Sequence, residues 1–168
     1  MPQLAEVGNN VWVGNHHACD IFREKFVHQD IRLSPKIIHI WHPTQPGHCG
    51  NMTGSPSLQS SHSLVIAYKE GDELRSEVLQ RIYDFAYSES PIHPPLLIHC
   101  AAGIGRSPTL ALVCKVARQR NIFDAMGDVA QGMWKYYEIK VAPQFLTHPL
   151  SSIFEWLGDK IYTDPNAY

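Results

Sequence analysis

One segment of the sequence combines a cysteine, an arginine and a glycine-rich run at a spacing suited to anion chemistry. Cys100 follows the apolar run 96–98, and Arg106 comes six positions later; the residues between them are small or apolar: Ala101, Ala102, Gly103, Ile104 and Gly105. A loop of this composition can curl so that successive backbone N–H groups point into one concavity. A helix that starts at the end of the loop adds the positive end of its dipole. The sequence therefore predicts that residues 101–106 bind a tetrahedral oxyanion.

The same surroundings favour Cys100 as a nucleophile. Thiols at helix N-termini beside cationic groups ionise more readily than free cysteine, and the thiolate is the reactive form. Arg106 can hold two oxygens of the anion with its planar guanidinium, which a lysine cannot do. The hydroxyl of Ser107 is expected to hydrogen-bond the sulfur and ease its departure, and His99 to orient the loop. A plain core cysteine would not explain an arginine at a helix start, where the dipole disfavours positive charge.

The pattern H-C-x5-R-S, here His99 to Ser107, resembles the signature of the protein tyrosine phosphatase superfamily. The Arg-Ser-Pro-Thr continuation and the short chain look most like its dual-specificity branch. Two weaker similarities support this: residues 11–14 look like the opening strand of that branch, and residues 141–145 like the segment before its final helix, with Gln144 in place of Asn. The resemblance implies hydrolysis of phosphate monoesters through a cysteinyl-phosphate intermediate, with no metal and no organic cofactor.

Ester cleavage also needs a proton donor for the leaving oxygen, and in this family an aspartate from an earlier loop supplies it. We assign this role to Asp72, which lies 28 positions before Cys100, next to Gly71 and between a predicted strand and a predicted helix. Glu70 is the alternative, and Asp84 is disfavoured because it falls inside the helix. A helix N-cap would be a sufficient reason for Asp72 by itself, and both roles can coexist. Activity is expected to favour mildly acidic pH.

The loop interior carries no lysine or arginine, whereas relatives that act on polyphosphorylated inositol lipids usually have lysines there. This favours phosphotyrosine, or phosphotyrosine together with phosphoserine and phosphothreonine, in a protein or in a small phosphoester substrate. Pocket depth separates these substrates, and it depends on loops that the sequence does not place. Two other interpretations stay open: a phosphate- or phosphoprotein-binding module, and a cysteine enzyme similar to arsenate reductases or sulfurtransferases.

The other cysteines and the histidines are less informative. Cys19, Cys49, Cys100 and Cys114 form no CxxC pair and match no zinc template, so we expect free thiols. Cys49 could approach Cys100 and protect it after oxidation, while Cys114 is expected to pack within the helix after the loop. Ten histidines include no HxxxH or HExxH pattern, so no metal site is predicted. The aromatic residues 134, 136 and 137 are taken as packing residues, with a substrate groove as the alternative.

Hydrophobic periodicity predicts the elements that position the loop. Strands are expected at 11–13, 36–41, 63–68 and 96–99, and helices at 16–27, 73–87, 107–120, 124–137 and 150–160. Asp72 is the expected N-cap of the second helix, and 43–63 is a long irregular loop. The alternation of strands and helices predicts an α/β fold with a central, mostly parallel sheet flanked by helices on both faces. No linker divides residues 1–168, so we expect a single domain.

Composition limits the possible partners. With 44% hydrophobic and 18% charged residues the chain is globular in type, and a net charge of −2 argues against a nucleic-acid partner. No apolar run approaches the roughly 18 or more residues needed to span a bilayer. Residues 1–10 show no secretory signal. We therefore expect a cytoplasmic monomer that binds neither nucleic acid nor membrane.

Overall fold

Five strands form one twisted sheet with a single antiparallel edge. The computed structural model describes residues 4–15, 17–26, 34–41, 62–68, 74–89, 92–100, 106–137 and 150–163. The strands are β1 Leu4–Glu6, β2 Val11–Gly14, β3 Lys36–Trp41, β4 Ser63–Ala67 and β5 Leu96–His99, in the spatial order β1-β2-β5-β3-β4. β1 runs antiparallel to β2, and the other three pairs are parallel. The predicted mostly parallel sheet is confirmed; β1, with three residues, is too short to show a periodic pattern and was not predicted.

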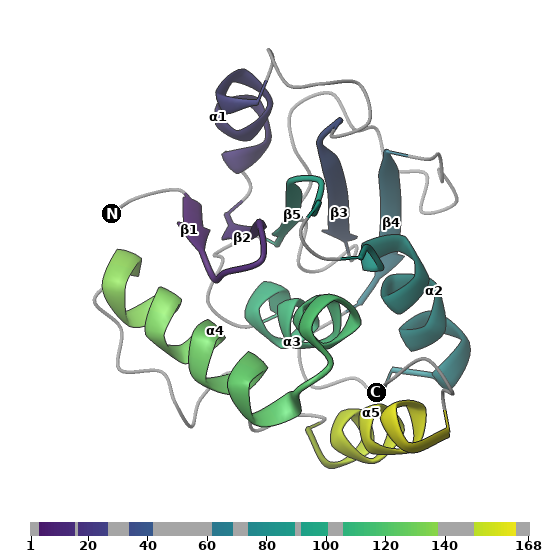
Figure 1. The fold of residues 1–168 in the computed structure, drawn as a ribbon. Coiled ribbons are helices and arrows are strands. Elements are labelled where there is room, and N and C mark those ends of the chain that lie inside the picture. Colours follow the sequence, from purple (N-terminus) through teal and green to yellow (C-terminus); the bar gives the residue numbers. More distant parts are fainter. Residues whose placement is uncertain are drawn as a thin grey trace.

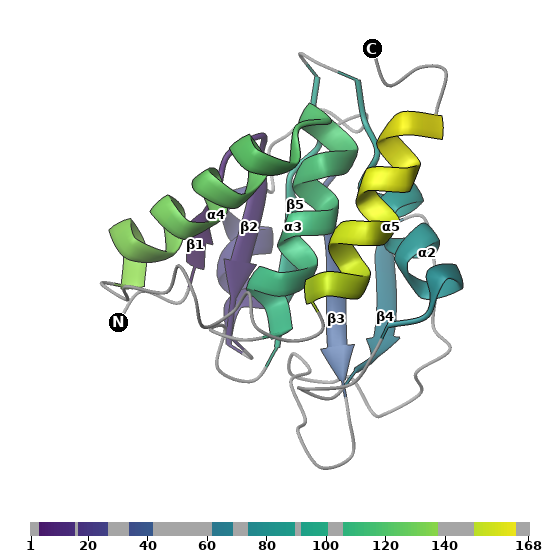
Figure 2. The same ribbon diagram turned by 90° about the horizontal axis from the view of Figure 1, so that it is seen from below.

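Helices cover both faces of the sheet, as predicted. The described helices are α1 Ala18–Lys25, α2 Ser76–Ala86, α3 Arg106–Gln119, α4 Ile122–Tyr137 and α5 Leu150–Thr163. Figure 1 shows α1 on one side of the sheet and the other four on the opposite side. Figure 2, seen from below, shows α2, α3, α4 and α5 in front of the strands. Among these helices, none has the length and apolar character of a membrane-crossing segment.

Alternation along the strands divides the buried side chains between the two faces. Ile38 and Ile98 belong to the large core beneath α2–α5, whereas Ile37 and Leu97 belong to a small core beneath α1. Successive side chains of a strand point to opposite faces. This alternation puts His39 and His99 on the α1 side of the sheet. Cys100, one position further, belongs to the large core.

The start of α2 differs from the prediction. Arg75, not Asp72, is the N-cap, and no side chain caps the helix. The carbonyl oxygen of Arg75 accepts the backbone N–H groups of Val78 and Leu79, each at 3.0 Å, so the backbone closes the first turn without an aspartate. The N-cap assignment of Asp72 is therefore wrong. Asp72 itself, and the predicted loop except residues 62 and 63, lie outside the described residues.

A network of buried cations joins four elements at the amino ends of the parallel strands. Lys115 of α3 contacts Asn9 Oδ1 and lies 3.0 Å from Asp128 Oδ2 of α4. Arg118 of α3 donates from Nε to the carbonyl oxygen of Ala86 at 2.9 Å and from Nη1 to that of Asn9 at 2.8 Å. Burial lowers the pKa of Arg118 to about 10, so it stays charged at neutral pH. The network fixes α2, α3 and α4 relative to the β1–β2 turn.

Candidate active site

Cys100 lies at the carboxyl edge of the sheet, directly after its central strand. β5 has β2 on one side and β3 on the other, and the carboxyl ends of these three parallel strands meet at the same edge. The backbone N–H of Cys100 donates to the carbonyl oxygen of Gly14, the last residue of β2, at 3.3 Å. In open α/β sheets, ligands bind outside the carboxyl ends of the strands, at the point where the connections that follow two neighbouring strands go to opposite faces of the sheet. The connections do so here, since α1 follows β2 on one face and α3 follows β5 on the other.

The thiol of Cys100 contacts the first turn of α3. Its sulfur lies 3.1 Å from the hydroxyl oxygen of Ser107, and both side chains are buried. Ser107 is the second residue of α3, so the positive end of that helix lies beside the sulfur. The expected contact between these two residues is thus present.

The predicted oxyanion-binding loop, residues 101–106, is described only at its last residue. Arg106 is the first residue of α3, as the predicted arrangement requires. The side chain of Arg106 and the residues 101–105 lie outside what the structure describes. Their assignment to phosphate binding stays a prediction.

His99 is held within the sheet beside a second histidine. Its ring is fully buried, and its Nε2 lies 2.6 Å from Nδ1 of His39, with the two rings edge to face at 4.7 Å between centroids. One ring nitrogen of this pair donates and the other accepts, according to the tautomers. Because His99 points to the α1 face and Cys100 to the other, this contact fixes the strand end just before the thiol. That placement agrees with an orienting role for His99.

The proton donor is not placed. Asp72 and Glu70 both lie outside the described residues, so their assignment remains a prediction. Asp84 lies within α2, is exposed, and accepts a hydrogen bond from Gln80 Nε2 at 2.7 Å. This helical position agrees with the expectation that Asp84 is not the donor.

The cysteines differ sharply in environment. Cys114 is free and fully buried in α3, as expected, and burial raises its pKa to about 12, so it is not a nucleophile at neutral pH. Cys100 is also free. Cys19, however, is disulfide-bonded, so the expectation of four free thiols is wrong. Linear spacing between cysteines could not reveal this, because the pairing depends on how the chain folds over the sheet. Cys49 lies outside the described residues.

One group of side chains among the described residues could hold a metal ion. It consists of Cys19, His39 and His99, whose ligand atoms all lie within 4.8 Å of one another. The sequence did not indicate this group, because the three residues belong to no motif and come from α1, β3 and β5.

The arrangement of sheet and helices is similar to that of solved phosphatase and phosphatase-like structures. Human DUSP28 superimposes with a TM-score of 0.58 at 13% identity, covering 95% of this chain and 93% of that chain. The human tyrosine phosphatase-like serine/threonine/tyrosine-interacting protein gives a TM-score of 0.58 at 14% identity, over 90% and 95% of the two chains. The PTP-2 phosphatase of Cydia pomonella gives 0.50 at 17% identity, over 95% and 91%. No protein-family model and no curated protein sequence matches.

The chain therefore has the fold of the cysteine-dependent tyrosine and dual-specificity phosphatases. The resemblance that the segment His99 to Ser107 suggested is confirmed at the level of the fold. At identities of 13–17% the likeness carries no information on substrate or activity, which the residues of the site must supply.

Proposed function

We propose that this protein is a cysteine-dependent phosphatase that hydrolyses phosphate monoesters, with phosphotyrosine in proteins as its principal substrate. The contact of 3.1 Å between Cys100 Sγ and Ser107 Oγ carries the proposal. It brings a free thiol at a strand end against the N-terminus of a helix that begins with an arginine. This combination suits a thiolate nucleophile beside a bound oxyanion.

The reaction has two displacements. In the first, the thiolate of Cys100 attacks phosphorus, the P–O ester bond breaks, and Asp72 gives its proton to the leaving oxygen. In the second, water attacks the cysteinyl phosphate, its proton passes to Asp72, and the S–P bond breaks. The hydroxyl of Ser107 stabilises the departing thiolate, while Arg106 and the loop amides of 101–105 bind the phosphoryl oxygens throughout. Neither step requires a metal or an organic cofactor.

Substrate choice follows from charge at the loop. The absence of lysine and arginine from residues 101–105 disfavours highly anionic head groups and favours a single phosphate on an aryl ring. A deep pocket would restrict the enzyme to phosphotyrosine, and a shallow one would also admit phosphoserine and phosphothreonine.

The proposal is tested by hydrolysis of an aryl phosphate across pH by wild type, Cys100→Ser, Arg106→Lys and Asp72→Asn. Cys100→Ser is expected to abolish turnover, since a neutral hydroxyl cannot replace the thiolate. Arg106→Lys is expected to reduce kcat/KM by about 100-fold or more, because it loses bidentate contacts that strengthen in the transition state. Asp72→Asn should remove one limb of the pH profile; if Glu70→Gln does so instead, Glu70 is the donor.

Cys114→Ser is the matched control, because it alters a buried thiol whose pKa is about 12 and should leave turnover unchanged. A wild type without activity, or a Cys100→Ser variant as active as wild type, would overturn the proposal.

A phosphoprotein-binding module is the second candidate. One structurally similar protein carries the name of a phosphatase-like interacting protein, so the fold does not by itself decide catalysis. Tight binding of a phosphotyrosine peptide by wild type without release of phosphate would favour this candidate. Sulfur transfer or arsenate reduction in place of ester hydrolysis would favour the third interpretation of the loop.

A further inference from the structure

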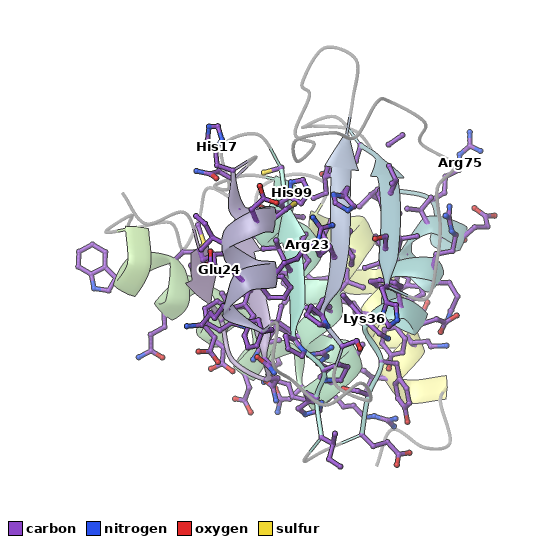
Figure 3. All side chains as sticks on the ribbon, turned by 90° about the horizontal axis from the view of Figure 1, so that it is seen from above. His17, Arg23, Glu24, Lys36, Arg75 and His99 are labelled. Carbon is purple, nitrogen blue, oxygen red and sulfur yellow. The ribbon has the colours of Figure 1, made fainter. Side chains whose placement is uncertain are left out.

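Three side chains with metal-binding atoms converge on the α1 side of the sheet. Cys19 lies in the first turn of α1, His39 in β3, and His99 ends β5. The thiol sulfur and one ring nitrogen from each histidine lie within 4.8 Å of one another, and all three residues are at most 3% exposed. Figure 3 looks onto this face and shows His99 beside α1. The proposed phosphatase reaction uses neither Cys19 nor His39.

The sheet itself holds the two histidines in position. His39 and His99 are directly paired across the parallel strands β3 and β5, and both point to the α1 face. Their facing nitrogens, Nδ1 of His39 and Nε2 of His99, are 2.6 Å apart. In a tetrahedral zinc site with Zn–N bonds of about 2.0–2.1 Å, two such nitrogens lie about 3.4 Å apart. The two nitrogens would therefore need to separate by only about 1 Å, and the sulfur, which lies within 4.8 Å of both, to approach by at most a similar amount.

The surroundings favour a borderline-soft cation. Cys19 belongs to the small apolar core beneath α1, together with Trp12, Ala18, Phe22, Ile37 and Leu97, and both histidines are buried. One sulfur and two imidazole nitrogens suit Zn²⁺, whereas Mg²⁺ and Ca²⁺ require oxygen ligands. Three protein ligands leave the fourth position of a tetrahedral zinc site to a further donor.

The disulfide at Cys19 sets the condition for binding, since a disulfide sulfur is no longer a thiolate. We infer that the reduced protein binds one Zn²⁺ through Cys19, His39 and His99, and that metal and disulfide are alternative states of this one cluster. A phosphine reductant converts the disulfide and one water into two thiols and becomes the phosphine oxide. The Cys19 thiol then releases its proton to solvent as the S–Zn bond forms. The histidine that donates to its neighbour changes tautomer, with no net loss of a proton.

The metal-bound state would tether α1 to the sheet through His39 and His99. The core beneath α1 is small, whereas α2–α5 share a much larger one, and α1 is the only described helix on its face. A bond from α1 to β3 and β5 strengthens this thin side and fixes the strand end that carries Cys100. Reduced protein is therefore expected to have a higher Tm with Zn²⁺ than without it.

The test is a titration of the Cys100→Ser protein with Co²⁺ and then Zn²⁺, after reduction by a phosphine and removal of metals. The Cys100→Ser background removes the proposed nucleophile as a competing ligand and makes the result independent of phosphatase activity. We expect one equivalent of Co²⁺, a thiolate-to-cobalt charge-transfer band, the intense visible bands of tetrahedral Co²⁺, and loss of both on adding Zn²⁺. The unreduced protein should show none of these bands.

Adding Cys19→Ser should weaken binding of Co²⁺ by more than about 100-fold and remove the charge-transfer band. Substituting a residue that only hydrogen-bonds to a metal ligand already costs about 10–100-fold in metal affinity, so loss of a ligand should cost more. Adding Cys114→Ser, the matched control at another buried cysteine, should change neither. His39→Gln should weaken binding while keeping the thiolate band at high Co²⁺ concentration. The inference would be overturned if the reduced protein binds no Co²⁺, if it binds Co²⁺ without a thiolate band, or if binding is equal after Cys19→Ser. If a variant does not fold, the presence or absence of the thiolate band in the Cys100→Ser parent still decides the question.

Discussion

At the scale of single residues, the chemistry depends on which partner each thiol has. Cys100 and Cys114 are both free and buried, yet only Cys100 has a side-chain hydroxyl and a helix N-terminus against its sulfur. Cys114 lies in the middle of α3 among apolar residues, where burial raises its pKa to about 12. Burial alone therefore does not distinguish the two cysteines; the hydroxyl and the helix N-terminus beside its sulfur are what suit Cys100 to the proposed role of nucleophile.

The Ser107 hydroxyl can be tested separately from the thiol. Ser107→Ala should lower kcat for an aryl phosphate by about 10- to 100-fold, because a hydrogen bond to a charged group contributes about 1.5–3 kcal/mol. The KM should fall together with kcat, so that kcat/KM changes little, because slower hydrolysis lets the cysteinyl phosphate accumulate. Burst kinetics should show that release of phosphate from the cysteinyl phosphate is the slowed step.

Thr109→Ala provides a matched control, because it removes another buried hydroxyl from the same helix. It should lower stability and leave kcat unchanged. If Ser107→Ala keeps wild-type kcat, the contact at 3.1 Å has no part in turnover.

At the scale of elements, sequence patterns predicted most of the strands and helices that position Cys100. β3 and β5 have the predicted bounds because each is a short, mostly apolar run delimited by proline or by the glycine-rich loop 101–105. Helix α3 starts within one residue of its predicted start. The N-cap of α2 was wrong because an aspartate suited to that role occurs slightly early, and backbone contacts of Arg75 serve instead.

The candidate site was predictable only where it is local in sequence. Cys100 and Ser107 are close in the chain, so a strand, a short loop and a helix suffice to predict their contact. The group of Cys19, His39 and His99 depends on β3 and β5 being neighbours and on α1 lying above them. Such pairings across the sheet leave no trace in a single sequence, and neither does the disulfide at Cys19.

The packing of α4 against β1 gives a prediction at this scale. A Cβ at Gly132 would lie 2.6 Å from the carbonyl oxygen of Glu6 and 2.9 Å from Cγ1 of Val7, whereas one at Gly127 would meet nothing within 4 Å. Gly132→Ala should therefore lower the free energy of unfolding by about 1–3 kcal/mol. Gly127→Ala, in the same helix, should raise it by up to about 1 kcal/mol, because alanine favours the helical backbone.

Urea unfolding of both variants measures the difference. A Gly132→Ala protein as stable as wild type would mean that α4 and β1 do not approach this closely.

At the scale of the whole molecule, different side chains gather at the carboxyl ends and at the amino ends of the parallel strands. The carboxyl edge carries Cys100 and the cluster of Cys19, His39 and His99, whereas the amino edge carries the buried cations Lys115 and Arg118. Figure 3 shows the separation, with His99 near one end of the strands and Lys36 near the other. Helix α3 spans the distance, since its first turn contacts the thiol and its last turns hold the cations.

The amino edge should make folding sensitive to acid. Burial, and then the charges of Arg118 and Lys115, lower the pKa of His93 below its ordinary value. Between that lowered pKa and the ordinary value of about 6.5 the unfolded chain binds more protons, so stability falls as pH falls through this window. Thermal unfolding from pH 8 to pH 5 should show a smaller loss of Tm for His93→Gln than for wild type. Parallel curves for the two proteins would exclude His93 as a source of the acid sensitivity.

From the proposed function, two substitutions at opposite ends of α3 are expected to have opposite effects on activity and stability. Arg118→Met leaves the carbonyl oxygens of Ala86 and Asn9 without their donor, and should cost about 2–4 kcal/mol of unfolding free energy. Its kcat/KM, measured well below the Tm, should stay within about twofold of wild type, because the carboxyl edge keeps its contacts. Ser107→Ala should show the reverse, with kcat lowered by about 10- to 100-fold and stability nearly kept. If Arg118→Met instead lowers kcat/KM while stability is unchanged, the two edges are coupled through α3 and the amino edge belongs to the catalytic machinery.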